Sequence, residues 1–128
     1  MKFNGLITGF CSLLIMTSLT CGCFQNDGFD VTINVLYSSP HHINNTTVYL
    51  DNDLFLQFKN KTIETYPPLL GDKTTHLKTG DHKILVIDTN FNLTRTRTLD
   101  VDYRMYVDII ISEDSIDISA SKEQTGYK

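Results

Sequence analysis

A two-residue alternation of apolar and polar side chains dominates this chain from residue 29 onward. In 29–37 the odd-numbered positions carry large apolar side chains: Phe29, Val31, Ile33, Val35 and Tyr37. Because successive side chains of a strand point to opposite faces, this period predicts a strand with one buried face. No segment after residue 28 combines a 3.6-residue period with helix caps, so we predict an all-β fold.

Further β-prone runs, separated by turn signals, extend the pattern. They predict strands at 46–50, 54–59, 82–88, 92–101, 103–111 and 116–120. The residues 51–53 favour a hairpin turn, and 38–45 read as a loop. The paired prolines in 65–72 predict a crossing between sheets, because proline cannot donate to a ladder. These signals predict a single immunoglobulin-like or transthyretin-like β-sandwich of seven or eight strands after an N-terminal signal helix.

Side-chain patterns also predict where some strands lie in the sandwich. The segment 82–88 is apolar on both faces, which is typical of a central strand. Arg95 and Arg97 share a face with apolar neighbours. This pattern is typical of an edge strand whose charged side chains prevent pairing with another chain.

The core is predicted to contain two regular rows. Val107, Ile109 and Ile111 should face inward opposite a second row, made of Val31, Ile33 and Val35. A register slip of one residue would bury Arg104 and Asp108 at high cost, so we expect Asp108 on the polar face.

The first 26 residues differ from the rest of the chain. One positive charge at Lys2 precedes a stretch without charge, whose dense apolar core is nearer 15 residues than the roughly 20 of a membrane-spanning helix. Small residues follow this core, and no basic cluster comes after them to stop transfer. These features predict a cleaved signal peptide, with a retained membrane helix as the alternative.

All three cysteines, Cys11, Cys21 and Cys23, lie in the first 23 residues. A disulfide framework or a thiolate zinc site in the domain is therefore excluded. Gly22-Cys23 after Leu19 resembles the lipobox of bacterial lipoproteins in a relaxed form, with Leu four positions before the cysteine. The resemblance implies lipid attachment at Cys23, with Cys21 as second choice. The alternative is an ordinary secretory peptide whose cysteines have no special role.

These boundaries divide the chain into four parts. They are a lipoprotein signal peptide at 1–22, a lipidated tether at 23–28, the β-sandwich at 29–122 and a polar tail at 123–128. Without the leader, the chain has ten basic and fifteen acidic residues, a net charge of −5. Nucleic-acid binding requires a concentrated basic face, so we expect no nucleic-acid partner.

Two stretches, "TVYLDNDL" and "LKTGDHKILVID", resemble the PEGA-type and related immunoglobulin- or transthyretin-like modules of bacterial envelope proteins, and the resemblance covers roughly Val48–Asp88. Asn52 stands where these modules often have glycine, and asparagine tolerates the same left-handed turn. The "G-x-T-P" that usually follows the hairpin is missing. The resemblance implies a binding or spacer module without catalytic residues.

Four histidines, His41, His42, His76 and His82, raise the possibility of metal chemistry. His76 and His82 flank a turn, so an alternative hypothesis is a secreted or periplasmic metal-binding protein or enzyme that uses this pair. Zinc requires three or four converging ligands, and no "HxH" or "HExxH" spacing occurs. We therefore predict no metal, no cofactor and no catalytic residue.

Two kinds of short motif concern covalent modification. Asp114-Ser115-Ile116 resembles the triplets that some diderm bacteria O-glycosylate, which makes Ser115 a candidate site. Four "N-x-T" sequons begin at Asn44, Asn45, Asn60 and Asn92. Beside a lipobox they are read as background, whereas a eukaryotic source would make them N-glycosylation candidates.

Together these features lead us to expect a lipoprotein of the cell envelope, anchored to a membrane lipid through its N-terminus. Its domain would face the periplasm or the cell exterior and act as a binding, spacer or accessory module. The expected partner is a protein or glycan of the envelope.

Overall fold

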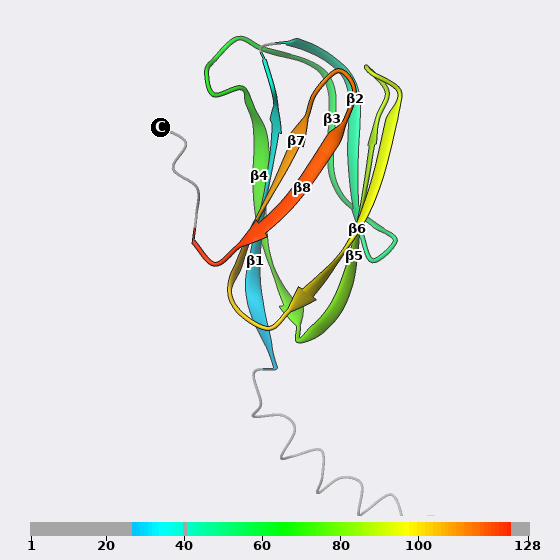
Figure 1. The fold of residues 1–128 in the computed structure, drawn as a ribbon. Coiled ribbons are helices and arrows are strands. Elements are labelled where there is room, and N and C mark those ends of the chain that lie inside the picture. Colours follow the sequence, from blue (N-terminus) through cyan, green and yellow to red (C-terminus); the bar gives the residue numbers. More distant parts are fainter. Residues whose placement is uncertain (1–26, 40, 124–128) are drawn as a thin grey trace, which may run out of the picture.

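The computed structural model describes residues 27–39 and 41–123, which form two four-stranded β-sheets packed face to face (Figure 1). The strands are β1 Gly28–Tyr37, β2 His41–Leu50, β3 Asp53–Ile63, β4 Leu69–Lys78, β5 Gly80–Asp88, β6 Leu93–Val101, β7 Met105–Ile111 and β8 Ile116–Ser121. The described residues contain no helix, which confirms the predicted all-β sandwich. The predicted signal helix lies outside them.

The strand order is β4-β1-β7-β8 in one sheet and β3-β2-β5-β6 in the other. β1 runs parallel to β7, and every other pairing among the described strands is antiparallel. In a constant-type immunoglobulin domain the first strand shares a sheet with the second, fifth and fourth. Here β1 and β2 lie in different sheets, so the strand order differs from that of a constant-type domain.

Several predicted strand roles are confirmed. β5 lies between β2 and β6, and β6 is an edge strand. The β2–β3 connection is a tight hairpin in which Asp51 and Asn52 have φ angles of 51° and 71°. These positive values are typical of the two-residue turns whose twist matches that of the flanking strands. The chain also crosses between sheets after β3, since β3 and β4 belong to different sheets.

Two segments predicted as loops are largely strand. β2 already begins at His41, within the predicted loop 38–45, and pairs there with the end of β3. β4 was missed altogether, and its first residues lie in the predicted loop 65–72. Both segments are polar, and β4 has a hydrogen-bonded neighbour on one side only. Backbone pairing, rather than an apolar stripe, therefore makes them strands.

The two predicted apolar rows both face the core, but they do not lie opposite each other. In the parallel β1–β7 pairing, Ile33 stands beside Val107 and Val35 beside Ile109, and all four side chains are fully buried. The rows are therefore neighbours in one sheet. The other sheet covers them with its own buried side chains, among them Val48, Leu50, Ile84, Val86, Leu99 and Val101.

Asp108 lies on the outer face, as predicted, yet it is only 7% exposed. The β1–β7 register places it beside Asn34, whose side-chain nitrogen donates a hydrogen bond of 3.0 Å to its carboxylate. Asn34 is 3% exposed. Asp108 thus lies on the predicted polar face, but this part of the face is buried. The sequence pattern showed which face Asp108 occupies but not how deeply that face is covered.

One open side of the sandwich, between edge strands β6 and β8, is bridged by arginines. Arg95 donates from Nη1 to the carbonyl oxygen of Ile116 at 3.0 Å, and Arg97 donates to that of Ile118. Both arginines project from β6, in register with the buried residues of β5. The two arginine side chains thus reach across the open side of the sandwich from β6 to β8. This explains their position on an otherwise apolar face.

Lysines bridge the opposite side, between edge strands β3 and β4. Lys61 donates to the carbonyl oxygen of Leu70 at 2.8 Å, and Lys73 donates to that of Phe55 at 3.4 Å. The Lys73 ammonium also lies 4.7 Å from the centroid of the Phe55 ring. Cationic side chains therefore span both open sides, where unpaired edges would otherwise invite pairing with another chain.

We expect the double variant Arg95→Thr/Arg97→Thr to self-associate at concentrations where the wild type does not. Threonine is favoured in strands, so β6 should still form. Its side chain, however, is too short to reach β8. Light scattering coupled to size exclusion would show a shift to larger species. The control is Arg104→Thr, which removes a positive charge that does not lie between β6 and β8. An unchanged particle size for the double variant would show that the arginines do not prevent self-association through this edge.

Candidate functional site

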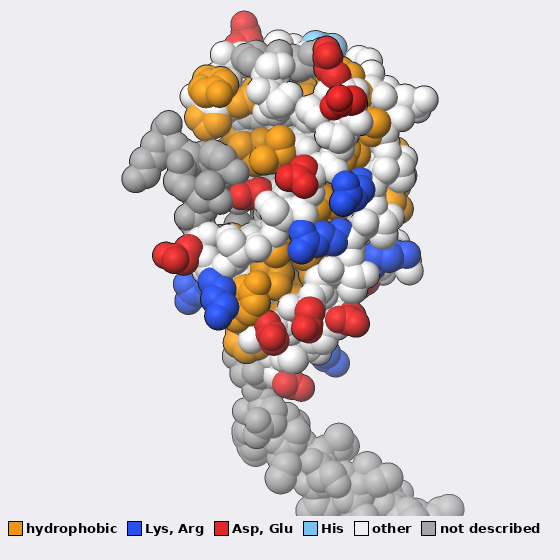
Figure 2. Space-filling model, viewed as in Figure 1, with side chains coloured by type: hydrophobic (Ala, Val, Ile, Leu, Met, Phe, Trp, Pro, Cys, Tyr) orange, Lys and Arg blue, Asp and Glu red, His pale blue; other side chains and the backbone are white. Residues whose placement is uncertain are grey.

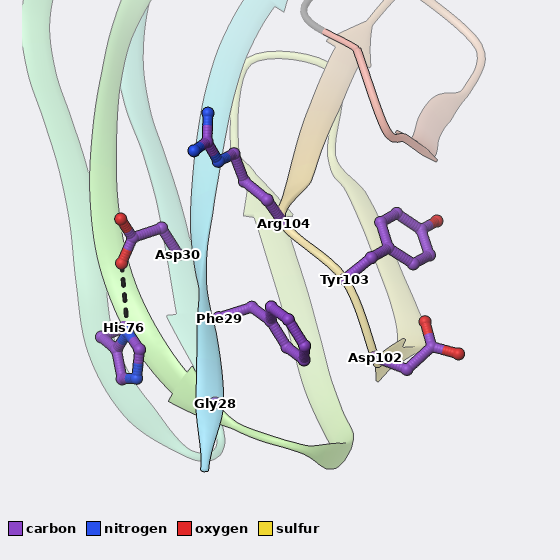
Figure 3. Close-up of a pocket in the computed structure, with 7 residues that line it drawn as sticks. All are labelled: Gly28, Phe29, Asp30, His76, Asp102, Tyr103 and Arg104. Carbon is purple, nitrogen blue, oxygen red and sulfur yellow. Dashed lines mark hydrogen bonds and ion pairs between the residues drawn. The ribbon is translucent and has the colours of Figure 1, made fainter. Parts of the chain in front are cut away.

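The end of the sandwich at which β1 begins, here called the proximal end, contains an open pocket of about 420 Å³ (Figure 3). The start of β1, the end of β4 and the connection between β6 and β7 form its walls. The lining residues are Gly28, Phe29, Asp30, His76, Asp102, Tyr103 and Arg104.

Strand register brings these distant segments together. Asp30 pairs with His76 of β4, and the β1–β7 pairing that begins at Val31 and Met105 places Arg104 close to β1. The Nδ1 atom of His76 lies 3.1 Å from a carboxylate oxygen of Asp30. Both side chains are about half exposed, so solvent screens this pair and its contribution to stability is small.

The pocket combines aromatic surface with charges of both signs. Figure 3 shows Phe29 and Tyr103 on one side of β1, and the Asp30–His76 pair on the other. The Lys122 ammonium lies 5.2 Å from the centroid of the Tyr103 ring. Small-ligand sites usually have mainly apolar walls with a few polar groups. Four of the seven residues that line this pocket are instead acidic, basic or histidine side chains, so its lining is mainly polar.

A second polar group at the proximal end is built on the β2–β3 turn. A carboxylate oxygen of Asp51 lies 2.5 Å from Nδ1 of His82, and its other oxygen accepts the Lys83 N–H at 2.9 Å. Nε2 of His82 lies 2.7 Å from the Lys78 carbonyl oxygen. Partial burial opposes the charged forms of both residues. Their hydrogen bonds outweigh it, so the pKa of His82 is raised and that of Asp51 is lowered.

A buried polar cluster occupies the opposite, distal end of the sandwich and joins the two sheets. The Tyr37 hydroxyl of β1 donates to Asp88 of β5 and lies 2.9 Å from the Thr46 hydroxyl of β2. Burial, followed by the hydrogen bond to Asp88, raises the pKa of Tyr37 well above its usual value. The phenol therefore stays protonated, and we assign this cluster to structure because its members hold one another.

The predicted site residues have different outcomes. Cys21 and Cys23 lie outside the described residues. Ser115 is exposed in the β7–β8 turn, where its carbonyl oxygen accepts the Ser112 N–H at 2.9 Å. His76 and His82 contact different aspartates. Across residues 27–39 and 41–123, no three His, Cys, Asp or Glu side chains are grouped to hold a metal ion.

The four sequons differ in accessibility. Asn44, Asn60 and Asn92 are exposed, whereas Asn45 is partly buried. The hydroxyl residues of the first two sequons, Thr46 and Thr47, are buried in the folded domain.

Comparison with known proteins adds no family assignment. The scan against protein-family models gave no match, and the search of curated proteins found no similar sequence. Within the described part of the chain, no helix has the length and apolar character needed to cross a membrane.

Sequence reasoning missed most of the proximal pocket. The predicted strand 103–111 included Tyr103, but β7 starts only at Met105, and the preceding residues line the pocket. Of the lining residues, only His76 belonged to the candidate metal-binding pair. No local signal marks the others, because the parallel β1–β7 pairing that gathers them joins segments more than 70 residues apart.

Proposed function

We propose that this chain is a lipid-anchored protein of the cell envelope whose β-sandwich binds, or holds at a distance, a protein or glycan partner. The observation that supports it most is the position of Gly22-Cys23, five residues before the start of β1. Among the described residues, the buried core begins at Val31.

The place where β1 begins supports an orientation relative to the anchor. Five residues span at most about 17 Å when fully extended. A lipid on Cys23 would thus keep the proximal end and its pocket close to the bilayer, while the distal loops would point away. A partner near the membrane surface would meet the pocket, and a more distant one would meet the distal loops.

The charge of the domain indicates how it would be attached. Figure 2 shows acidic side chains along the lower rim and basic side chains across the middle of the visible face. The chain after residue 22 carries a net charge of −5. Anionic lipids attract polybasic segments, so they would not hold this domain. Attachment would depend on acyl chains, each buried CH₂ contributing about 0.8 kcal/mol.

Replacing Cys23 by Ala is expected to release the protein from membranes or to leave it as an uncleaved precursor. Fractionation of the producing cells, followed by mass spectrometry of the N-terminus, distinguishes these results. Cys21→Ala is the matched control and should remain anchored. An intact Met1 in the wild type, or a mature N-terminus at an unmodified Cys23, would contradict the anchor.

A further inference from the structure

His82 at the proximal end has a hydrogen-bond acceptor at each ring nitrogen. Nδ1 lies 2.5 Å from the Asp51 carboxylate, and Nε2 lies 2.7 Å from the carbonyl oxygen of Lys78. A neutral imidazole has one N–H donor, whereas the imidazolium has two. Only the protonated ring satisfies both contacts at once.

The partner groups do not offer another way to satisfy this geometry. A carbonyl oxygen only accepts, so Nε2 must carry a proton toward Lys78. A protonated Asp51 would be needed to donate to a bare Nδ1. The second oxygen of Asp51, however, accepts the Lys83 N–H at 2.9 Å, which favours the ionised carboxylate.

The contacts of His82 connect three parts of the proximal end. Asp51 is in the β2–β3 turn, Lys78 ends β4, and His82 itself lies near the start of β5. The Asp51 N–H also donates to the Lys83 carbonyl oxygen at 2.9 Å. Just after β4, the Thr79 N–H donates to the carbonyl oxygen of Asp27, at the start of the described chain. Loss of one His82 contact would therefore loosen the end at which the chain enters the domain.

We propose that His82 is a proton-dependent clip that, as an imidazolium, joins the β2–β3 turn to the end of β4 and releases one of them on deprotonation. This proposal does not depend on the lipid anchor.

The charges around His82 set the direction of the effect. Asp51 and Asp81 favour the imidazolium, and the neighbouring ammonium-bearing residues on β4 and β5 are Lys78 and Lys83. Since folding raises the pKa of His82, the clip stabilises fully below the ordinary histidine pKa of about 6.5 and is lost as the pH rises through the raised value. Since folding lowers the pKa of Asp51, the acid-side loss begins only below about 3.9.

The test compares the wild type with His82→Gln, which is polar but cannot take up a proton. At pH 5.5 we expect the melting temperature of the wild type to be about 5 °C higher than that of the variant. This difference should shrink toward zero by pH 9. In ¹⁵N NMR spectra, both His82 ring nitrogens should be protonated at pH 5.5, and one should lose its proton at a pH above 6.5.

His76→Gln is the matched control, because His76 also pairs with an aspartate but is about half exposed. Its melting-temperature difference from the wild type should be small, because solvent screens an exposed pair. A second variant, Asp51→Asn, should lower the pKa of His82 toward its ordinary value. The clip is refuted by a neutral His82 ring at pH 5.5, or by a His82→Gln difference that is the same at pH 5.5 and pH 9.

Discussion

Replacing Asp88 by Ala is expected to lower the free energy of unfolding by about 3–5 kcal/mol. Asp88 ends β5 and is 1% exposed. One carboxylate oxygen accepts hydrogen bonds from the Tyr37 hydroxyl, from the Thr46 hydroxyl at 2.9 Å and from the Asn90 amide at 3.1 Å. The other accepts the Phe91 N–H at 3.0 Å. Alanine would leave these donors without their acceptor.

The size of the effect follows from where the donors lie. Tyr37 and Thr46 are buried on different sheets, and Asp88 joins them across the sandwich. A buried donor left unsatisfied costs about 1–3 kcal/mol. Tyr37→Phe removes one donor and keeps the ring, so it should cost only about 1 kcal/mol.

Urea unfolding of the purified domain would measure both changes. Asp117→Ala is the control, because Asp117 is an exposed aspartate on β8 and its loss should change stability by less than about 0.5 kcal/mol. If Asp88→Ala unfolds at nearly the wild-type urea concentration, the cluster does not tie the sheets together.

Replacing Ile109 by Ala should destabilise the domain by about 2–5 kcal/mol. Ile109 is fully buried in β7, between Val35 of β1 and Ile118 of β8. Removing its side chain leaves a cavity beneath the other sheet, and close-packed interiors relax only partly around such a gap. This loss would be a large fraction of the stability of a domain of this size.

The neighbours of Ile109 on the same strand provide controls for its facing. Ile110 lies on the outer face and is partly exposed, so Ile110→Ala should cost clearly less. Asp108→Asn keeps an oxygen that can accept the hydrogen bond of Asn34, so its cost should also be smaller. Denaturant unfolding in which Asp108 proved critical and Ile109 indifferent would show that the facing of β7 is inverted.

The local pattern predicted strands well where one face is buried against the core. β1 and β5 were predicted to within about two residues, because alternation along a strand reports directly on its two faces. The turn at Asp51 and Asn52 was predicted for a similar reason, since positive φ angles favour particular residues. β4 escaped prediction because an edge strand with polar side chains carries no such pattern.

The contacts of His82 and the burial of Asp108 could not be predicted from the local sequence pattern. His82 was predicted to lie near a turn, but its two acceptors come from the hairpin at Asp51 and from the end of β4. The burial of Asp108 depends on its neighbour Asn34, 74 residues away. Such contacts are products of register between strands that are distant in sequence.

By itself, the sequence determined that the domain is all-β, which positions face the core, and that one tight hairpin follows β2, because each depends on neighbours within a few residues. Only the tertiary structure decided that β1 lies parallel to β7, that their apolar rows are neighbours in one sheet, and that Asp30, His76 and Arg104 line one pocket. The physical reason is that alternation gives each strand two faces but no partner. Which strands pair is set by how all eight together bury those faces and satisfy their backbone hydrogen bonds.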